Sequence, residues 1–127
     1  MNILVDTHIA LWALYDSNRL TPTAVQYLTD NENTIYCSLA SVWEVEIKNS
    51  IGKLDVISTE FIKDAEDLGF RILPISRSHI FGLSKIERKA NHKDPFDRLL
   101  LSQAIVEQYK FLTMDEKIRQ YSLDCIL

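Results

Sequence analysis

The sequence is poor in the residues that mark loop-rich, disulfide-bonded or membrane-spanning proteins. Only three glycines, three prolines and two cysteines occur among its 127 residues, which excludes a disulfide scaffold and a fold made mostly of turns. No apolar stretch reaches the roughly 18 residues of a membrane-spanning helix, so we expect no membrane partner. Cys37 and Cys125 each lie in an apolar run, and we expect both to be small core residues of a reduced protein rather than zinc ligands.

The remaining composition is that of an ordinary globular domain. Hydrophobic residues make up 46% and charged residues 25% of the chain, and its length matches one domain. The first residues lack the basic region and the apolar length of a signal peptide. We therefore expect a soluble, cytoplasmic protein with a single domain over residues 1–127.

The positive charges are concentrated in one part of the chain. The net charge is −4, which weakly disfavours binding to nucleic acid by bulk electrostatics alone. Residues 1–70 hold 4 basic and 11 acidic residues, whereas residues 71–98 hold 7 basic and 3 acidic residues. This basic stretch fits a solvated helix face with its loop, and it fits a surface that contacts phosphates equally well.

Short apolar runs alternate with segments that carry helix signals. Thr21 and Asp94 each precede a proline, which is typical of a helix start, and Gly52 and Gly69 follow segments with helical periodicity. We expect strands at 2–6, 34–37, 70–73 and 111–114, with a fifth candidate at 123–127. Helices are expected at 7–15, 22–29, 38–50, 58–68, 76–86 and 94–109, and a polar loop at 88–93. This alternation predicts an α/β fold of three layers: a central, mainly parallel sheet of four to five short strands with helices on both faces.

Four acidic residues stand where functional groups gather in such a fold, beyond the carboxyl ends of the strands. Asp6 ends the first strand, and Asp115 directly follows the fourth. Asp97 lies in the first turn of the helix that leads into the fourth strand. Glu44 lies on the helix after the second strand, at the edge of an apolar stripe. Glu46 is close to another apolar arc, so periodicity alone does not choose between these two glutamates.

Each of these acids also has a structural interpretation. Asp97 lies where the helix dipole favours an anion, and Glu44 can pair with Lys48 four residues later. An N-cap role is open to three acids that directly precede a helix: Asp6, Asp94 and, before a short helix at 116–121, Asp115.

Taken together, the acids indicate a metal site. If the sheet is parallel, three of them emerge at one edge, and Glu44 can reach the same place. Two carboxylates about 4 Å apart repel each other by roughly 4 kcal/mol at an effective dielectric constant of about 20. Either some of the acids take up protons with a raised pKa, or a divalent cation neutralises the group. Oxygen ligands without a cluster of Cys or His favour a hard ion, Mg²⁺ or Mn²⁺.

Several stretches of the chain together resemble the PIN domain, and within it the VapC-type toxins of type II toxin–antitoxin systems. They are LVDTHIALW (4–12), SLASVWEVEIK (38–48), GKL (52–54), HKDPFDRLL (92–100) and LTMD (112–115). The likeness runs in order over essentially the whole chain and implies a PIN-like three-layer fold. It also implies a metal-dependent ribonuclease that uses Mg²⁺, or Mn²⁺ in its place, and leaves 5′-phosphate ends.

The resemblance implies roles for individual residues. The acidic quartet of the family, which is catalytic and holds the metal, matches Asp6, Glu44, Asp97 and Asp115, which selects Glu44 over Glu46. Asp94 matches a further acid of this subfamily, either as a metal ligand or only as a helix cap. Thr7 and Thr113 match small hydroxyl positions that support the ligands by hydrogen bonds.

By resemblance, the partners are an RNA substrate, a small cognate antitoxin and a second copy of the chain in a homodimer. The antitoxin would lie in an apolar groove near Trp12 and Trp43 and block the site. Lys93 and Arg98, beside the acids, are the candidate contacts to RNA. Two other functions stay open from the residues alone: a metal-dependent phosphatase or phosphoacceptor domain, since an Asp at a strand end can be phosphorylated, and a non-catalytic interaction module whose acids are only caps.

Overall fold

A four-stranded parallel sheet forms the centre of the computed structural model, which describes residues 1–88 and 94–127. Lys93 and all but the first residue of the expected polar loop lie outside the described residues. The strands lie in the order β3-β2-β1-β4, and every neighbouring pair is parallel: β1 (Asn2–Val5), β2 (Thr34–Ser38), β3 (Arg71–Leu73) and β4 (Lys110–Leu112). Val5 pairs with Cys37 on one side and with Leu112 on the other, so these three strands run to the same edge.

The helices begin where the sequence predicts caps. The hydroxyl oxygen of Thr21 accepts a hydrogen bond from the amide of Ala24 (3.2 Å), and Gly69 ends a helix with a φ of 102°. In the described part of the chain, none of them is long and apolar enough to cross a membrane. They are α1 (Thr7–Tyr15), α2 (Pro22–Thr29), α3 (Leu39–Ser50), α4 (Ser58–Leu68), α5 (Arg77–Phe81), α6 (Pro95–Glu107) and α7 (Glu116–Arg119), with the 3₁₀ helices η1 (Ser17–Arg19) and η2 (Gly82–Lys85).

Three elements differ from the expectation. The helix expected at 76–86 is divided into α5 and η2, and at the division Gly82 lies so close to α6 that a Cβ atom there would stand 2.6 Å from the Ser102 hydroxyl oxygen. Helix α6 ends at Glu107 because Gln108 adopts a left-handed φ of 60°. The fifth strand is reduced to a single parallel bridge between two residues, Phe111 and Ile126.

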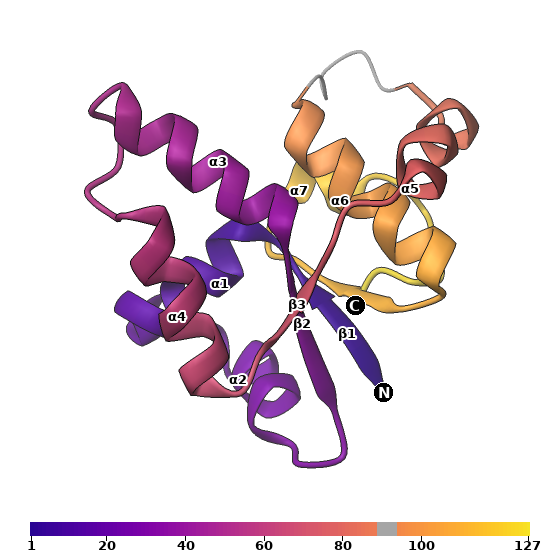
Figure 1. Ribbon diagram of the computed structural model, residues 1–127. Coiled ribbons are helices and arrows are strands. Elements are labelled where there is room, and N and C mark those ends of the chain that lie inside the picture. The colour runs from indigo at the N-terminus through magenta and orange to yellow at the C-terminus, as the bar shows by residue number, and fades with distance from the viewer. Residues whose placement is uncertain (89–93) are drawn as a thin grey trace.

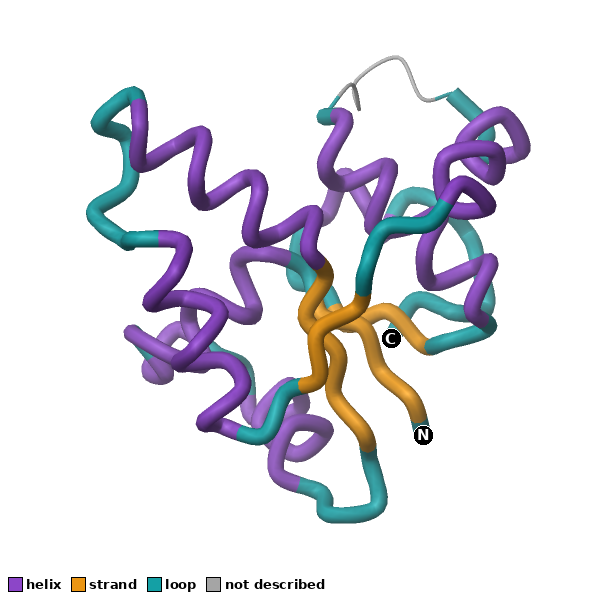
Figure 2. The backbone as a smooth tube through the Cα atoms, in the orientation of Figure 1, coloured by secondary structure: helices purple, strands orange, loops and turns teal. Residues whose placement is uncertain are grey.

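Helices cover both faces of the sheet, as expected (Figures 1 and 2). Alternate side chains of β1 point to opposite faces: Ile3 and Val5 pack into a core with α1, α2 and α4, whereas Leu4 packs into a core with α6 and α7. In Figure 1, α1 to α4 lie on one side of the sheet and α5 to α7 on the other. Helices α3 and α6 contact each other, so the two layers meet.

The two cysteines are unpaired and lie at different depths. Cys37 is fully buried in β2, and this burial raises the pKa of its thiol to about 12, whereas Cys125 is half-buried. We expect iodoacetamide to alkylate Cys125 much faster than Cys37 in the native protein, because only an accessible thiolate reacts. Mass spectrometry after brief labelling measures the two rates. Equal rates would show that β2 opens readily, against the buried position described here.

Candidate functional site

Asp6 lies at the carboxyl end of the central strand and is held there by three hydrogen bonds. Its amide donates to the carbonyl of Leu112 (3.1 Å), its Oδ1 accepts from the amide of Ile9 (2.7 Å), and its Oδ2 accepts from the hydroxyl of Thr113. Only 4% of Asp6 is exposed. Burial raises the pKa of its carboxyl group and the charge of Asp115 adds to this, while the two hydrogen bonds to the carboxylate partly oppose the rise.

Thr113, just beyond β4, connects Asp6 to Asp115. The buried hydroxyl of Thr113 donates to Asp6 Oδ2, and its oxygen accepts from the amide of Asp115 (3.0 Å). Asp115 in turn caps α7, since its Oδ1 accepts from the amide of Lys117 (2.8 Å). The two acids line a pocket of about 200 Å³, the acid pocket, together with His8, Trp12 and Met114. The structure therefore brings two of the four expected acids together.

Glu44 is buried on α3, with only 3% of the residue exposed. Its Oε2 accepts from the Nζ of Lys48 (2.8 Å), which is the pair expected from the sequence. Its Oε1 is buried and has no hydrogen-bond partner among the described residues, a costly state unless a cation or water fills the place. Glu46 is instead exposed and accepts from the hydroxyl of Ser58 (2.7 Å). Burial thus favours Glu44 over Glu46 as the functional acid.

Asp97 lies half-buried in the first turn of α6, after Pro95 and Phe96. Asp94 is exposed, and its Oδ1 accepts from the amides of Phe96 (2.8 Å) and Asp97 (3.2 Å), so the expected capping role is confirmed. The ring of Phe96 packs edge-on against the ring of Trp43, with 5.0 Å between the ring centroids. This contact ties the start of α6 to the middle of α3.

The four expected acids do not all line one pocket. Two share the pocket described above, whereas Glu44 and Asp97 lie outside its lining, on α3 and α6. The hydroxyls of Thr7 and Ser41 are hydrogen-bonded (2.9 Å), which joins the start of α1 to α3 one turn before Glu44. Among the described residues, no three Asp, Glu, His or Cys side chains stand close enough together to form a complete metal site.

The chemistry of these donors nevertheless fits a hard divalent cation. Mg²⁺ usually binds through one or two carboxylates and keeps several water molecules, so the pair formed by Asp6 and Asp115 is a sufficient protein contribution. A cation bound at Asp6 would also relieve the cost of burying its carboxylate. The unpartnered Oε1 of Glu44 is a further buried oxygen that could accept a cation.

A family model of the PIN domain matches residues 3–123. The chain belongs to the PIN domain family. PIN domains are in general nucleases, which hydrolyse nucleic acids, and they generally use divalent metal ions.

Two solved structures show the same PIN fold. One is VapBC2 from Rickettsia felis bound to a DNA fragment from their promoter, with a TM-score of 0.69 and 19% sequence identity over 100% of this chain and 96% of that chain. The other is a toxin–antitoxin complex from Klebsiella pneumoniae, with a TM-score of 0.62 and 21% identity over 98% of this chain and 95% of that chain. A comparison with curated proteins finds no significant match.

Arg98, expected as a contact to RNA, is turned into the PIN fold. Its guanidinium donates to three backbone carbonyls and one hydroxyl, at 3.2 to 3.5 Å, in Leu83, Ile86, Glu87 and Tyr121. These bonds hold η2 and the residues after it against α6. The side chain therefore has a structural role, and the geometry gives no support to the expected contact. Lys93, the other candidate, lies outside the described residues.

A buried polar network in this PIN domain escaped the sequence patterns. Gln103 on α6 is fully buried, its Oε1 accepts from the hydroxyl of Ser38 (2.5 Å), and its Nε2 donates to the carbonyl of Pro74 (3.2 Å). His79 lies beside it, with Nδ1 3.2 Å from Gln103 Nε2 and Nε2 3.2 Å from the Glu107 carboxylate. Because Ser38 caps α3, the network fixes the two acid-bearing helices, α3 and α6, relative to each other. The sequence signal for this network is Gln103, a polar residue on an apolar helix face.

Proposed function

We propose that this PIN domain is a divalent-metal-dependent endoribonuclease and the toxin of a type II toxin–antitoxin pair. The toxin assignment is supported by the two structural relatives, which come from a VapBC2 complex and a toxin–antitoxin complex. The catalytic assignment rests on one observation above all: the buried Glu44 Oε1 has no hydrogen-bond partner among the described residues. A helix cap or a surface acid does not need such an oxygen, whereas a metal ligand does.

Each role in the proposed site falls to a side chain described above. The residues that would hold the cation, Mg²⁺ or Mn²⁺ in its place, are Asp6, Glu44, Asp97 and Asp115. A bound cation would polarise the phosphate of the substrate and lower the pKa of a water molecule. Thr113 keeps Asp6 Oδ2 in place, and Thr7 ties α1 to α3. The proposed reaction is hydrolysis of an RNA phosphodiester, which leaves 3′-hydroxyl and 5′-phosphate ends.

The proposed protein partners are an antitoxin and, in a homodimer, a second copy of the chain. Three apolar residues at four-residue spacing, two on α3 and one at its C-cap, are 53%, 37% and 59% exposed: Trp43, Ile47 and Ile51. Such a stripe is suited to an apolar antitoxin segment. Trp12 is half-buried and lines the acid pocket, so a segment that reaches it would also cover Asp6. A cytoplasmic location is part of the same proposal.

A non-catalytic interaction module is the second candidate, because three of the acids do act as caps: Asp6, Asp94 and Asp115. Thermal melts separate the two functions. A true metal site stabilises the fold by RT ln(1 + [L]/Kd), which is about 2.7 kcal/mol at 100 times Kd, so we expect millimolar Mg²⁺ or Mn²⁺ to raise the melting temperature. An unchanged melting temperature with both ions would favour the module. The deep burial of Asp6 argues against a phosphoacceptor.

Two nearby glutamates on α3, Glu44 and Glu46, provide a matched test of the nuclease. We expect the purified protein to cleave single-stranded RNA with Mg²⁺ and not with EDTA, and the new 5′ ends to carry phosphate. Glu44→Gln should lower the rate by about 10²-fold or more. Glu46→Gln makes the same change two residues later on an exposed surface and should leave the rate unchanged. Full activity of Glu44→Gln would remove Glu44 from the site.

A further inference from the structure

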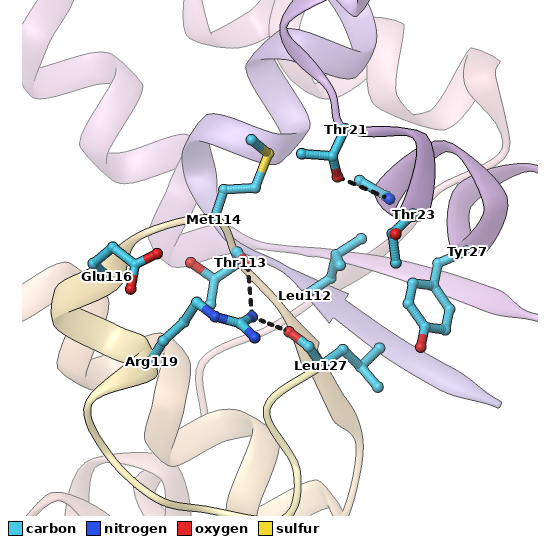
Figure 3. A pocket seen from close by; sticks show the side chains of 10 residues that line it. Thr21, Thr23, Tyr27, Leu112, Thr113, Met114, Glu116, Arg119 and Leu127 are labelled. Carbon is cyan, nitrogen blue, oxygen red and sulfur yellow. Dashed lines mark hydrogen bonds between the residues drawn. The ribbon is translucent and has the colours of Figure 1, made fainter.

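A second pocket adjoins the acid pocket and shares Met114 with it (Figure 3). This adjoining pocket measures about 350 Å³ and lies between the end of β4, the start of α2, helix α7 and Leu127. Thr113, which lines it, also donates a hydrogen bond to Asp6. A chain molecule that is bound at Asp6 and continues over Met114 therefore enters the adjoining pocket.

The adjoining pocket combines apolar walls with a polar rim. Figure 3 shows Tyr27 and Thr23 on one side and Arg119 with Leu127 on the other. The apolar surface comes from Leu112, Leu127 and the half-buried ring of Tyr27, and the hydroxyls come from Thr21, Thr23 and Thr113. An aromatic ring next to hydroxyl donors suits a ligand that has a flat ring and a polar backbone.

Arg119 supplies the positive charge of the adjoining pocket. One guanidinium nitrogen donates to the carbonyls of Thr113 (3.5 Å) and Leu127, so the group is held at the rim, while the residue as a whole is exposed. Within the described residues Arg119 forms no ion pair with a carboxylate side chain. One acid, Glu116, also lines the pocket. Both hydrogen bonds of Arg119 use the same nitrogen, so the remaining guanidinium nitrogens, which form no hydrogen bond with the described residues, are available to an anionic ligand that arrives from the acid pocket.

We propose that the adjoining pocket binds the nucleotide next to the scissile phosphate, with its base against Tyr27 and its phosphate near Arg119. This inference rests on the proposed ribonuclease function and deepens it. The volume, about 350 Å³, is at the lower end of ligand pockets, roughly 300 to 1,000 Å³, which gives room for one nucleotide but not for a helix of a protein partner. Stacking on Tyr27 accepts any base, so the pocket holds the strand without selecting its sequence.

Thr23→Glu tests the subsite without weakening the fold. Thr23 is exposed at the second position of α2, where the helix dipole favours an acidic side chain, so we expect the melting temperature to stay the same or rise. The new carboxylate repels a phosphate, so KM for a mixed-sequence single-stranded RNA should rise about tenfold with little change in kcat. Thr59→Glu is the matched control, because Thr59 is exposed at the second position of α4 and outside the pocket. Its KM should equal that of the wild type.

Arg119→Gln gives a second readout that does not depend on cleavage. In EDTA, fluorescence anisotropy with the same labelled RNA should show about tenfold weaker binding and a shallower salt dependence. If both pocket variants match the wild type while the wild type cleaves RNA, the subsite is refuted and the ribonuclease stands. If the wild type neither binds nor cleaves the RNA, the proposed function fails and the subsite fails with it. If Thr23→Glu changes the oligomeric state in size-exclusion chromatography, the pocket is a protein contact and the inference is overturned.

Discussion

Replacing Asp6 with Asn is expected to abolish RNA cleavage and, at the same time, to raise the melting temperature of the metal-free protein. Burial raises the pKa of the Asp6 carboxyl group, so the folded state disfavours its charged form. The destabilisation is absent below the unfolded-state pKa, about 3.9, and grows to its full value as the pH rises through the folded-state pKa. Asn removes this cost and keeps an oxygen that accepts from the amide of Ile9. We expect the rate of RNA cleavage to fall by about 10³-fold or more, because the negative charge of Asp6, a proposed metal ligand, is lost.

Calorimetry at several pH values and the RNA assay with Mg²⁺ test both halves of this expectation. The gain in melting temperature should be largest at neutral pH and should vanish at acidic pH, where Asp6 is protonated in both states. Asp55→Asn, an exposed change outside the site, should alter neither quantity. A less stable Asp6→Asn protein that still cleaves RNA would show that the carboxylate serves only as a helix cap.

Gln103→Leu is expected to cause a large loss of stability. The substitution removes the partners of the Ser38 hydroxyl and the Pro74 carbonyl, and it leaves His79 beside an apolar side chain. Each buried group left without a partner costs about 1–3 kcal/mol, so we expect a loss of about 3 kcal/mol. For a chain of this size that corresponds to a fall of about 10 °C in melting temperature.

Urea denaturation of Gln103→Leu, with the exposed Gln26→Leu as control, measures this loss. The control should lie within about 0.5 kcal/mol of the wild type. Because the Ser38–Gln103 bond joins α3 to α6, we also expect Gln103→Leu to bind Mn²⁺ more weakly at a temperature where it remains folded. Unchanged stability would mean that water enters the space left by the Gln103 amide and replaces its hydrogen bonds.

Local chemistry in the sequence predicted most of the architecture. Thr21, Asp94 and Gly69 set helix ends through bonds within a few residues of themselves, and the structure confirms all three. The four strands and the helices on both faces followed from short apolar runs that alternate with helical periodicity. The α/β fold with a parallel sheet was thus accessible from patterns that need no knowledge of distant contacts, whereas its assignment as a PIN fold came from the resemblance.

Features that depend on tertiary contacts were not accessible in this way. The division at Gly82 depends on the closeness of Ser102, which lies on another helix. The internal role of Arg98 depends on carbonyls that come from an earlier segment. Glu44 and Glu46 have similar periodicity, and only packing shows that the first is buried and the second exposed. How near Glu44 and Asp97 come to a bound cation stays a prediction.

The hydrogen bond between Thr113 and Asp6 joins residues 107 positions apart, because β1 and β4 are neighbours in the sheet. During translation, Asp6 is therefore made well before β4, the strand that completes its surroundings. At roughly 5–20 residues per second, the nascent chain exists for between about 5 and 20 s with Asp6 made and Thr113 not yet added. Under the proposed function, the site of the nascent chain is incomplete throughout this interval, so inhibition by an antitoxin becomes necessary only after β4 docks beside β1.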